Sequence, residues 1–131
     1  FTGPQQRTEV VEWLAWCDVY VLPSIVLPNG MTEGIPNVLV EAMAAGRPVV
    51  ASALTGVREL VDDGVHGRLF EPGDDAALAR QLAQCMARPG ETLAMVEAGR
   101  KRVEAEHDRE QCTRELFDLL SGPWPPIGED S

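Results

Sequence analysis

TEGIPNVLVEAMAAGRPVVAS, residues 32–52, is the stretch from which the fold class can be predicted. Pro36 suits the first turn of a helix, where its missing N–H is no loss, and Gly46 is typical of the residue that ends one. The run that follows, RPVVAS, is continuously apolar at its centre, as expected for a strand buried on both faces. We therefore expect a helix from Pro36 to Gly46 that leads directly into a buried strand at residues 47–52.

The rest of the chain continues this alternation of helices and strands. Further strands are expected at residues 18–24 and 68–70. Further helices are expected at 9–17 with Thr8 as N-cap, at 57–60 as a single turn, at 76–87 after Asp74 or Asp75, at 91–106 and at 109–120. This order predicts an α/β fold, a Rossmann-like parallel sheet with flanking helices. It would occupy residues 1–120, before a Pro-rich irregular tail at 121–131.

Composition limits the classes of function. The chain has 131 residues, which suits one domain or a large part of one, and its formal net charge of −10 disfavours nucleic acid as a partner. The three cysteines and two histidines show no metal-binding spacing, so neither a metal nor a cofactor is expected. There is no apolar run of the ~18 residues that a membrane span needs, so we expect a cytoplasmic protein. The chain opens on Phe1 rather than Met, which suggests a piece of a longer protein.

A single carboxylate interrupts the expected helix. Every residue from 38 to 45 except Glu41 is apolar. At about 100° per residue one arc of this helix is formed by Val38, Leu39, Ala42 and Met43. The opposite side is apolar too, so the helix is expected to be buried almost all round. A buried ionised carboxylate without partners is strongly unfavourable. Glu41 must therefore have a partner, reach a cleft or serve a function.

Glu33 precedes the N-terminus of the same helix. Helix N-termini attract anions through their backbone N–H groups, which are offered here by Gly34, Ile35, Asn37 and Val38. The stretch thus combines an amide cradle for phosphate with two carboxylates that can accept hydrogen bonds from hydroxyl groups. A nucleotide-sugar, with a diphosphate between two hydroxyl-bearing rings, would fit. The alternative is that Glu33 is a solvated loop acid and that Glu41 pairs with Arg47 or Arg58.

EGIPNVLVEAMAAGRPVVAS, residues 33–52, resembles the signature of the group 1, or family 4, retaining glycosyltransferases of the GT-B fold. That signature has two glutamates separated by seven residues, as Glu33 and Glu41 are, then Ala-Met-Ala, a Gly and a Pro-Val-Val strand. CDVYVLPS, residues 17–24, is similar to the strand that precedes the signature. TGVRELVDDGVHGRLFEPGDDAALA, residues 55–79, is similar to the segment that follows it. The ordered match implies part of the nucleotide-sugar-binding C-terminal domain.

The resemblance implies a role for each matching residue. Glu33 would be the catalytic residue beside the donor sugar, without having to act as a nucleophile, and Glu41 would accept hydrogen bonds from the ribose hydroxyls. The diphosphate would be held by the backbone amides of Gly34, Ile35, Asn37 and Val38. Gly56 would let the backbone approach the donor, or only permit a turn. One departure is Pro36, which removes an N–H from the cradle where many family members have glycine.

The implied enzyme transfers a sugar from a nucleotide-sugar donor to an acceptor hydroxyl with retention. The Glu-Gly-Ile-Pro variant is similar to enzymes of bacterial exopolysaccharide assembly, of the colanic-acid type. This implies a glycan or lipid-linked acceptor, bound by an N-terminal domain that this chain lacks, and a full-length protein at the periphery of the inner membrane. Also missing are the early donor-domain strands, with the Arg and Lys that pair with the diphosphate. We expect this chain alone to be inactive.

Two alternatives to a transferase stay open: a GT-B nucleotide-sugar epimerase, and a non-catalytic nucleotide-sugar-binding or interaction module of the same fold. The sheet edge left by the missing strands could also pair with a second copy of the chain, giving a homodimer. Near the start of the chain, Trp13 and Trp16 with Tyr20 are expected to pack in the core rather than to form a stacking platform. Glu59 is expected to have a structural role in its loop.

Overall fold

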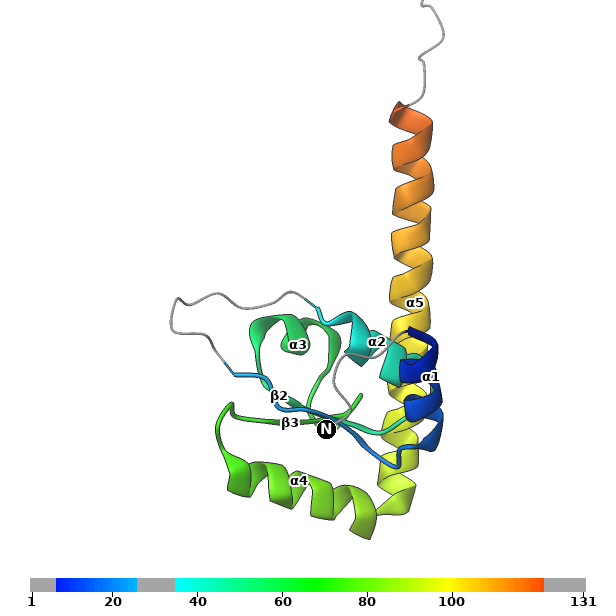
Figure 1. Ribbon diagram of the computed structural model, residues 1–131. Helices are drawn as coiled ribbons and strands as arrows, with labels where there is room; N and C mark the ends of the chain where they lie inside the picture. Colours follow the sequence, from blue (N-terminus) through cyan, green and yellow to red (C-terminus); the bar gives the residue numbers. More distant parts are fainter. Residues whose placement is uncertain (1–6, 26–34, 122–131) are drawn as a thin grey trace, which may run out of the picture.

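The computed structural model describes residues 7–25 and 35–121, with side chains for residues 9, 12–25 and 35–106. In this part of the chain a parallel sheet lies between helices on both of its faces (Figure 1). Strand β1 spans Tyr20–Leu22, β2 spans Val49–Ser52 and β3 spans Arg68–Phe70. Their order in the sheet is β1-β2-β3, with Val21 opposite Val50 and Ala51 opposite Leu69. The predicted α/β class is confirmed.

The helices alternate with these strands. They are α1 (Arg7–Trp16), α2 (Asn37–Ala44), α3 (Thr55–Leu60), α4 (Asp75–Ala87) and α5 (Pro89–Ser121). Asp74 caps α4, since its Oδ1 accepts a hydrogen bond from the Ala77 backbone N–H at 2.9 Å. The prediction of Thr8 as an N-cap is wrong, because α1 already begins at Arg7. Helix α3 extends beyond the single turn predicted at 57–60.

A single helix, α5, replaces the two helices predicted at 91–106 and 109–120. No Gly or Pro follows Gly99 within it, so nothing in the sequence forces a break at His107 and Asp108. Its first part packs against α2 and α4, and its later part extends far beyond the rest of the molecule (Figure 1). Within the described residues, no helix has both the length and the apolar character needed to cross a bilayer.

The core has one part on each face of the sheet. Strand β2 is buried along its whole length, and its side chains alternate between the two parts. The part beneath α2 and α3 includes Leu39, Met43, Val49, Ala51, Val57 and Leu60. The part beneath α4 includes Val50, Phe70 and Cys85. Burial on both faces explains why the sequence of β2 is apolar without alternation.

Helix α2 begins and ends where the sequence predicts. Pro36 is its N-cap, and Gly46, just past its end, has a φ of +72°, a left-handed conformation that favours glycine. The prediction that α2 is buried almost all round is wrong. It buries Leu39, Ala42 and Met43, whereas Val38 and Ala44 are exposed. Packing against β2 and α5 covers one side of α2 only.

Candidate functional site

The candidate site lies at the edge of the sheet where the parallel strands end. Leu22, Ser52 and Phe70 are the last residues of the three strands, and the chain turns from there into the next helix. In parallel α/β sheets, this edge is where ligands bind. The site therefore combines the loop after β1 with the starts of α2 and α3. In the described part of the chain, the first of these loops is represented by residues 23–25 and 35–36.

The start of α2 offers the amide groups that the sequence predicts. The first N–H groups to bond within the helix belong to Leu39 and Val40, and both donate to the Pro36 carbonyl, at 3.1 and 3.3 Å. The amides of Asn37 and Val38 therefore precede the helical hydrogen-bond pattern. The N-cap is Pro36, whose side chain has no acceptor that could bond to these amides. Backbone amides in this position are suited to an anion.

Glu41 lies one helical turn further along, at the flank of the buried side of α2. Its residue is half-buried, between Val40 and the buried Ala42. Tyr20, on β1, has a pKa that is raised by burial, then by the negative charge of Glu41 and then by Cys17. Tyr20 is therefore a neutral hydrogen-bonding group beside a carboxylate. Tyr20 was expected to pack, and it is half-buried against the core, but its electrostatic interaction with Glu41 was not predicted.

The two arginines that the alternative interpretation assigned to Glu41 have other contacts in the structure. Arg47 donates from Nη1 to the Cys17 carbonyl at 3.3 Å. Arg58 donates from Nε to the Ala53 carbonyl at 3.1 Å and from Nη2 to Glu71 Oε1 at 3.2 Å. The contact of Arg47 links the end of α1 to the start of β2. The contacts of Arg58 link α3 to the loop before it and to Glu71, just after β3.

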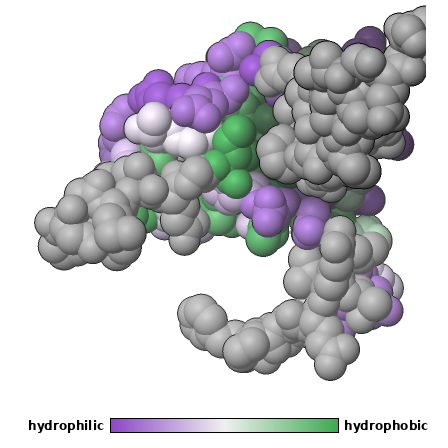
Figure 2. Space-filling model, turned by 90° about the horizontal axis from the view of Figure 1, so that it is seen from above, coloured by the Kyte–Doolittle hydropathy of each residue, from purple (hydrophilic) through white to green (hydrophobic). Residues whose placement is uncertain are grey.

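The other predicted site residues divide into three groups. Glu33 and Gly34 lie outside the described residues. Ile35, Asn37 and Val38 are exposed at the start of α2. Gly56 is buried in the first turn of α3. Where Figure 2 is not grey, hydrophobic and hydrophilic residues lie side by side, as on an ordinary protein surface.

Ser52 is a residue at this edge that the sequence analysis did not single out. It ends β2 and is 1% exposed, and its Oγ has no hydrogen-bond partner among the described residues. A polar side chain closing an otherwise apolar strand run is the signal that could have found it. Glu59, in contrast, is exposed, and its backbone carbonyl accepts a hydrogen bond from Arg102 Nη2 at 3.2 Å. That bond ties α3 to α5.

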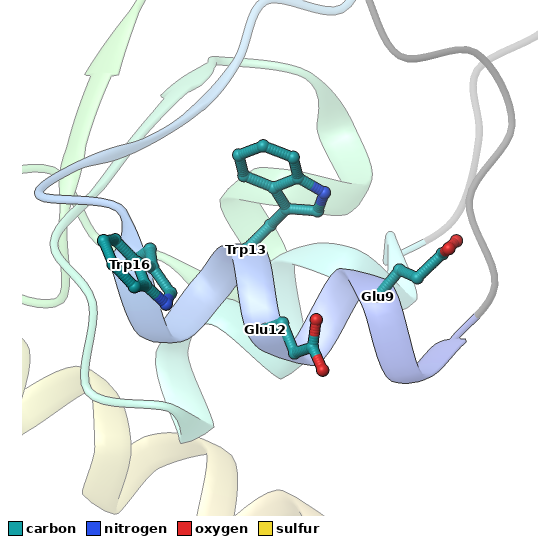
Figure 3. Close-up of a pocket in the computed structure, with 4 residues that line it drawn as sticks. All are labelled: Glu9, Glu12, Trp13 and Trp16. Carbon is teal, nitrogen blue, oxygen red and sulfur yellow. The ribbon is translucent and has the colours of Figure 1, made fainter.

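The expectation that Trp13 and Trp16 pack in the core is wrong. Trp13 is 57% exposed and Trp16 is 85% exposed, because α1 turns Leu14 toward the core instead. The two indoles, with Glu9 and Glu12, line a surface cavity of about 440 Å³ on α1 (Figure 3). This cavity is separate from the start of α2.

A second cavity, of about 430 Å³, is lined by Arg68 at the opposite end of β3, with Gly64, Val65, Glu91, Ala94 and Met95. Arg68 is 9% exposed. Its Nη1 donates to Gln84 Oε1 at 2.8 Å, and its Nη2 lies 3.7 Å from Glu91 Oε2. These contacts neutralise and hold the guanidinium, which accounts for it as a structural residue. No group of side chains suited to a metal ion occurs among the described residues.

A protein-family model and several relatives match most of the chain. The family model described as "Glycosyl transferases group 1" matches residues 1–88. The amylovoran biosynthesis glycosyltransferase AmsK of Erwinia amylovora is 36% identical over 118 residues. The putative colanic acid biosynthesis glycosyltransferase WcaL of Escherichia coli is 40% identical over 119 residues. Each match covers 90% of this chain and 29% of the relative, so the chain spans less than a third of their length.

Solved structures give the same result for the fold. HepE of Anabaena, in complex with UDP-glucose, matches with a TM-score of 0.75 and 29% identity, over 89% of this chain and 31% of HepE. The C-terminal domain of the group 1 family protein LpcC of Francisella tularensis matches with a TM-score of 0.69 and 21% identity. That match covers 82% of this chain and 52% of the solved domain, and at this identity it supports the fold alone.

Proposed function

This chain belongs to the group 1 glycosyltransferases and has the fold of part of a GT-B C-terminal domain, and from this premise we propose that it holds the nucleotide-sugar donor of a retaining transferase. The enzyme would move the sugar to an acceptor hydroxyl during bacterial polysaccharide synthesis. Support for the pathway class comes from AmsK and WcaL, whose names assign them to amylovoran and colanic acid biosynthesis. Support for the donor comes from HepE, which was solved with UDP-glucose.

Glu41 carries the proposal, because it is a half-buried carboxylate on an otherwise apolar helix face at the ligand-binding edge of the sheet. A carboxylate accepts hydrogen bonds in pairs, which suits the two neighbouring hydroxyls of a ribose. Tyr20 is protonated at neutral pH even at the ordinary tyrosine pKa of about 10, and burial and Glu41 raise its pKa further. It therefore adds no second negative charge beside the hydroxyls that Glu41 would bind.

The amides of Asn37 and Val38 would receive the diphosphate. They lie at the positive end of α2 and precede its hydrogen-bond pattern. Donors fixed there would stabilise the negative charge on the departing diphosphate, and such fixed donors are usually a large part of transition-state stabilisation. Glu33 and Gly34, which precede this turn in the sequence, would contact the donor sugar and extend the cradle. No metal takes part in this proposal.

The same electrostatics limit what this chain does alone. Its net charge is −10, and at the ligand edge Arg58 is paired with Glu71. A diphosphate would thus meet amides but no free arginine among the described residues of that edge. The basic groups that neutralise it would come from the rest of the enzyme, as would the acceptor site. We expect nucleotide binding by this chain to be weak, and sugar transfer to require the longer protein.

The test is a titration of the chain with UDP, GDP and ADP, followed by amide chemical shifts in NMR spectra. Shifts should concentrate in residues 35–41 and 53–58, and the nucleotide with the largest shifts would identify the base. Glu41→Ala should remove them. Glu97→Ala is the matched control, because Glu97 is an exposed carboxylate on α5. Shifts spread evenly over the chain, or shifts that survive in Glu41→Ala, would contradict the proposed site.

A further inference from the structure

We propose that Arg58 is a positioning residue for the donor site, which fixes the short loop between β2 and α3 at the ligand edge of the sheet. The inference rests on the proposed function, because this loop, residues 53–54, leads into Gly56, whose backbone would approach the donor. Arg58 would act through the loop and would not touch the nucleotide-sugar. Its role is thus distinct from those of Glu41 and the amides of α2.

Three hydrogen bonds join the 53–54 loop, α3 and the end of β3 into a closed ring, which we call the edge clamp. Arg58 donates from Nε to the Ala53 carbonyl at 3.1 Å and from Nη2 to Glu71 Oε1 at 3.2 Å. The Ala53 N–H donates to the carbonyl of Phe70 at 2.8 Å. The peptide bond between Phe70 and Glu71 closes the ring. Both backbone polar groups of Ala53 therefore have partners within the clamp.

The edge clamp lies at the point where sheet pairing stops. Ser52 and Phe70 are the last paired residues of β2 and β3, so Ala53 and Glu71 are each the first residue past a strand end. From there the chain turns into α3 on one side and toward α4 on the other. The guanidinium of Arg58 links these two departing segments, at the edge where parallel sheets bind their ligands.

Arginine has the chemistry that this position requires. Its guanidinium is planar and its N–H groups point in fixed directions, so one side chain can hold a carbonyl and a carboxylate together. The side chains of Arg58 and Glu71 are 56% and 73% exposed, and such exposed ion pairs add little to stability. We therefore expect the clamp to control the position of the loop more than the stability of the fold.

Direct contact between Arg58 and the diphosphate is the alternative role. Arg58 is a cation at the ligand edge, but its Nε and Nη2 already have partners. To reach a phosphate it would have to give up at least one of these contacts, and the 53–54 loop would lose the group that binds the Ala53 carbonyl. The geometry of the clamp therefore favours positioning over direct contact.

The first measurement is hydrogen exchange of the full chain without ligand, followed by NMR. The Ala53 amide reports opening of the clamp, because it is bonded to Phe70. Arg58→Ala should speed its exchange by about fivefold, which corresponds to ~1 kcal/mol. Arg58→Lys should have nearly the same effect, since lysine keeps the charge but not the two fixed directions. Exchange of the Ala51 amide, inside β2, should change less than about twofold.

Arg100 provides the matched control. Its Nε lies 3.3 Å from Glu104 Oε1 on α5, and the two side chains are 60% and 64% exposed. The Arg100–Glu104 pair therefore resembles the Arg58–Glu71 pair in length and exposure but lies outside the ligand edge. Arg100→Ala should leave the exchange of Ala53 and the binding of nucleotides unchanged.

The second measurement is the titration with UDP, GDP and ADP in the same variants. In Arg58→Ala, amide shifts should persist in residues 35–41 and disappear in residues 53–58, with nucleotide affinity lower by about fivefold or less. Arg58→Lys should not restore the lost shifts. A role that depended only on the charge of Arg58 would be restored by lysine.

Two variants of Glu71 separate positioning from direct binding. Glu71→Gln and Glu71→Ala both remove the negative charge, but only glutamine keeps an acceptor for Arg58 Nη2. The edge clamp predicts weaker nucleotide binding and faster Ala53 exchange in Glu71→Ala than in Glu71→Gln. Direct binding predicts the opposite order of affinities, because Glu71→Ala frees the guanidinium for the phosphate.

Unchanged exchange of Ala53 in Arg58→Ala would overturn the inference, since Arg58 would then not hold the loop. So would nucleotide binding in Glu71→Ala that equals or exceeds that in Glu71→Gln, or full retention of the shifts in residues 53–58 in Arg58→Ala. If the wild-type chain gave no shifts with any nucleotide while Arg58→Ala still sped exchange at Ala53, the proposed donor site would fail. The hold of Arg58 on the loop would stand, so the two failures are distinguishable.

Discussion

Helices α1 and α2 each lead into a strand of the same sheet, yet they depart from ordinary burial in opposite ways. Helix α2 places a carboxylate, Glu41, at the flank of a face that buries Leu39 and Met43. Helix α1 places two tryptophans in solvent and buries Leu14. Hydrophobic burial explains why Leu39 and Leu14 lie in the core. It explains neither the half-buried carboxylate on α2 nor the exposed tryptophans on α1. The comparison indicates that the residues which packing does not explain are the ones to test for binding.

The largest expected effect concerns the buried side of α2. Leu39 is fully buried beneath this helix, so Leu39→Ala should lower the free energy of unfolding by about 2–5 kcal/mol, through lost burial and the cavity left behind. Urea unfolding followed by circular dichroism measures it. A loss below about 1 kcal/mol, the size expected of an ordinary substitution, would mean that α2 is not anchored as its burial indicates.

The end of α2 comes next. Gly46 has a φ of +72°, and a Cβ there would meet only Val96 Cγ1 at 3.9 Å, an ordinary contact. Gly46→Ala should therefore destabilise the protein through backbone strain alone, by about 1 kcal/mol. Gly90→Ala is the matched control, since nothing lies within 4 Å of its Cβ position. Equal unfolding midpoints for the two variants would argue against the left-handed turn.

The third prediction concerns the carboxylate of α2. Tyr20 is the only tyrosine of the chain, and burial, Glu41 and Cys17 raise its pKa, in that order. Glu41→Gln should therefore lower the pKa of Tyr20, measured by the near-ultraviolet absorbance of the phenolate. Glu12→Gln, on α1, should leave that titration where it is. An unchanged or higher pKa of Tyr20 in Glu41→Gln would show that the charge of Glu41 does not act on Tyr20.

The sign of the accompanying stability change follows from the raised pKa of Tyr20. The unfolded chain loses the tyrosine proton near the usual value of about 10, and the folded protein loses it at higher pH. The stabilising contribution is therefore complete below pH ~10 and disappears as the pH rises through the folded pKa. In Glu41→Gln this contribution should be smaller, because less of the upward shift remains.

The smallest effect is expected at the exposed indoles of α1. Trp16 is 85% exposed, so Trp16→Ala should change the free energy of unfolding by no more than about 0.5 kcal/mol. Leu14→Ala, on the core side of the same helix, should cost about 2–5 kcal/mol. If Trp16→Ala were as destabilising as Leu14→Ala, α1 would be packed on both sides, and the contrast with α2 would disappear.

Local signals made the helix-to-strand unit around α2 and β2 predictable. Pro36 and Gly46 mark the ends of the helix through backbone chemistry that does not depend on tertiary contacts. The unbroken apolar run of β2 required cover on both faces, and this gave the α/β class. Asp74 was predictable as a cap for the same reason as Pro36, since its hydrogen bond reaches only to Ala77.

The features that sequence analysis missed depend on which neighbours are present. Helical spacing cannot tell whether another element covers Trp13 and Trp16. The electrostatic effect of Glu41 on Tyr20 acts between two elements that only the fold brings near each other. The assumed break at His107 had no helix-breaking residue to support it. Of the predicted site residues, Glu41 and the start of α2 lie in the described part of the chain and Glu33 and Gly34 do not; the roles of all of them stay predictions.

Helix α5 projects beyond the rest of the domain (Figure 1), so a small tilt of this helix moves its far end by a larger distance. With 33 residues it is roughly 50 Å long, and it is held by α2, α4 and the core as far as Val103. From Val103 to Ser121 the helix extends ~27 Å, so a tilt of one degree at Val103 would displace the far end by about 0.5 Å. If a ligand shifts α2, the resulting movement of α5 would be larger at its far end than at the site. A spectroscopic label at that end would detect the movement.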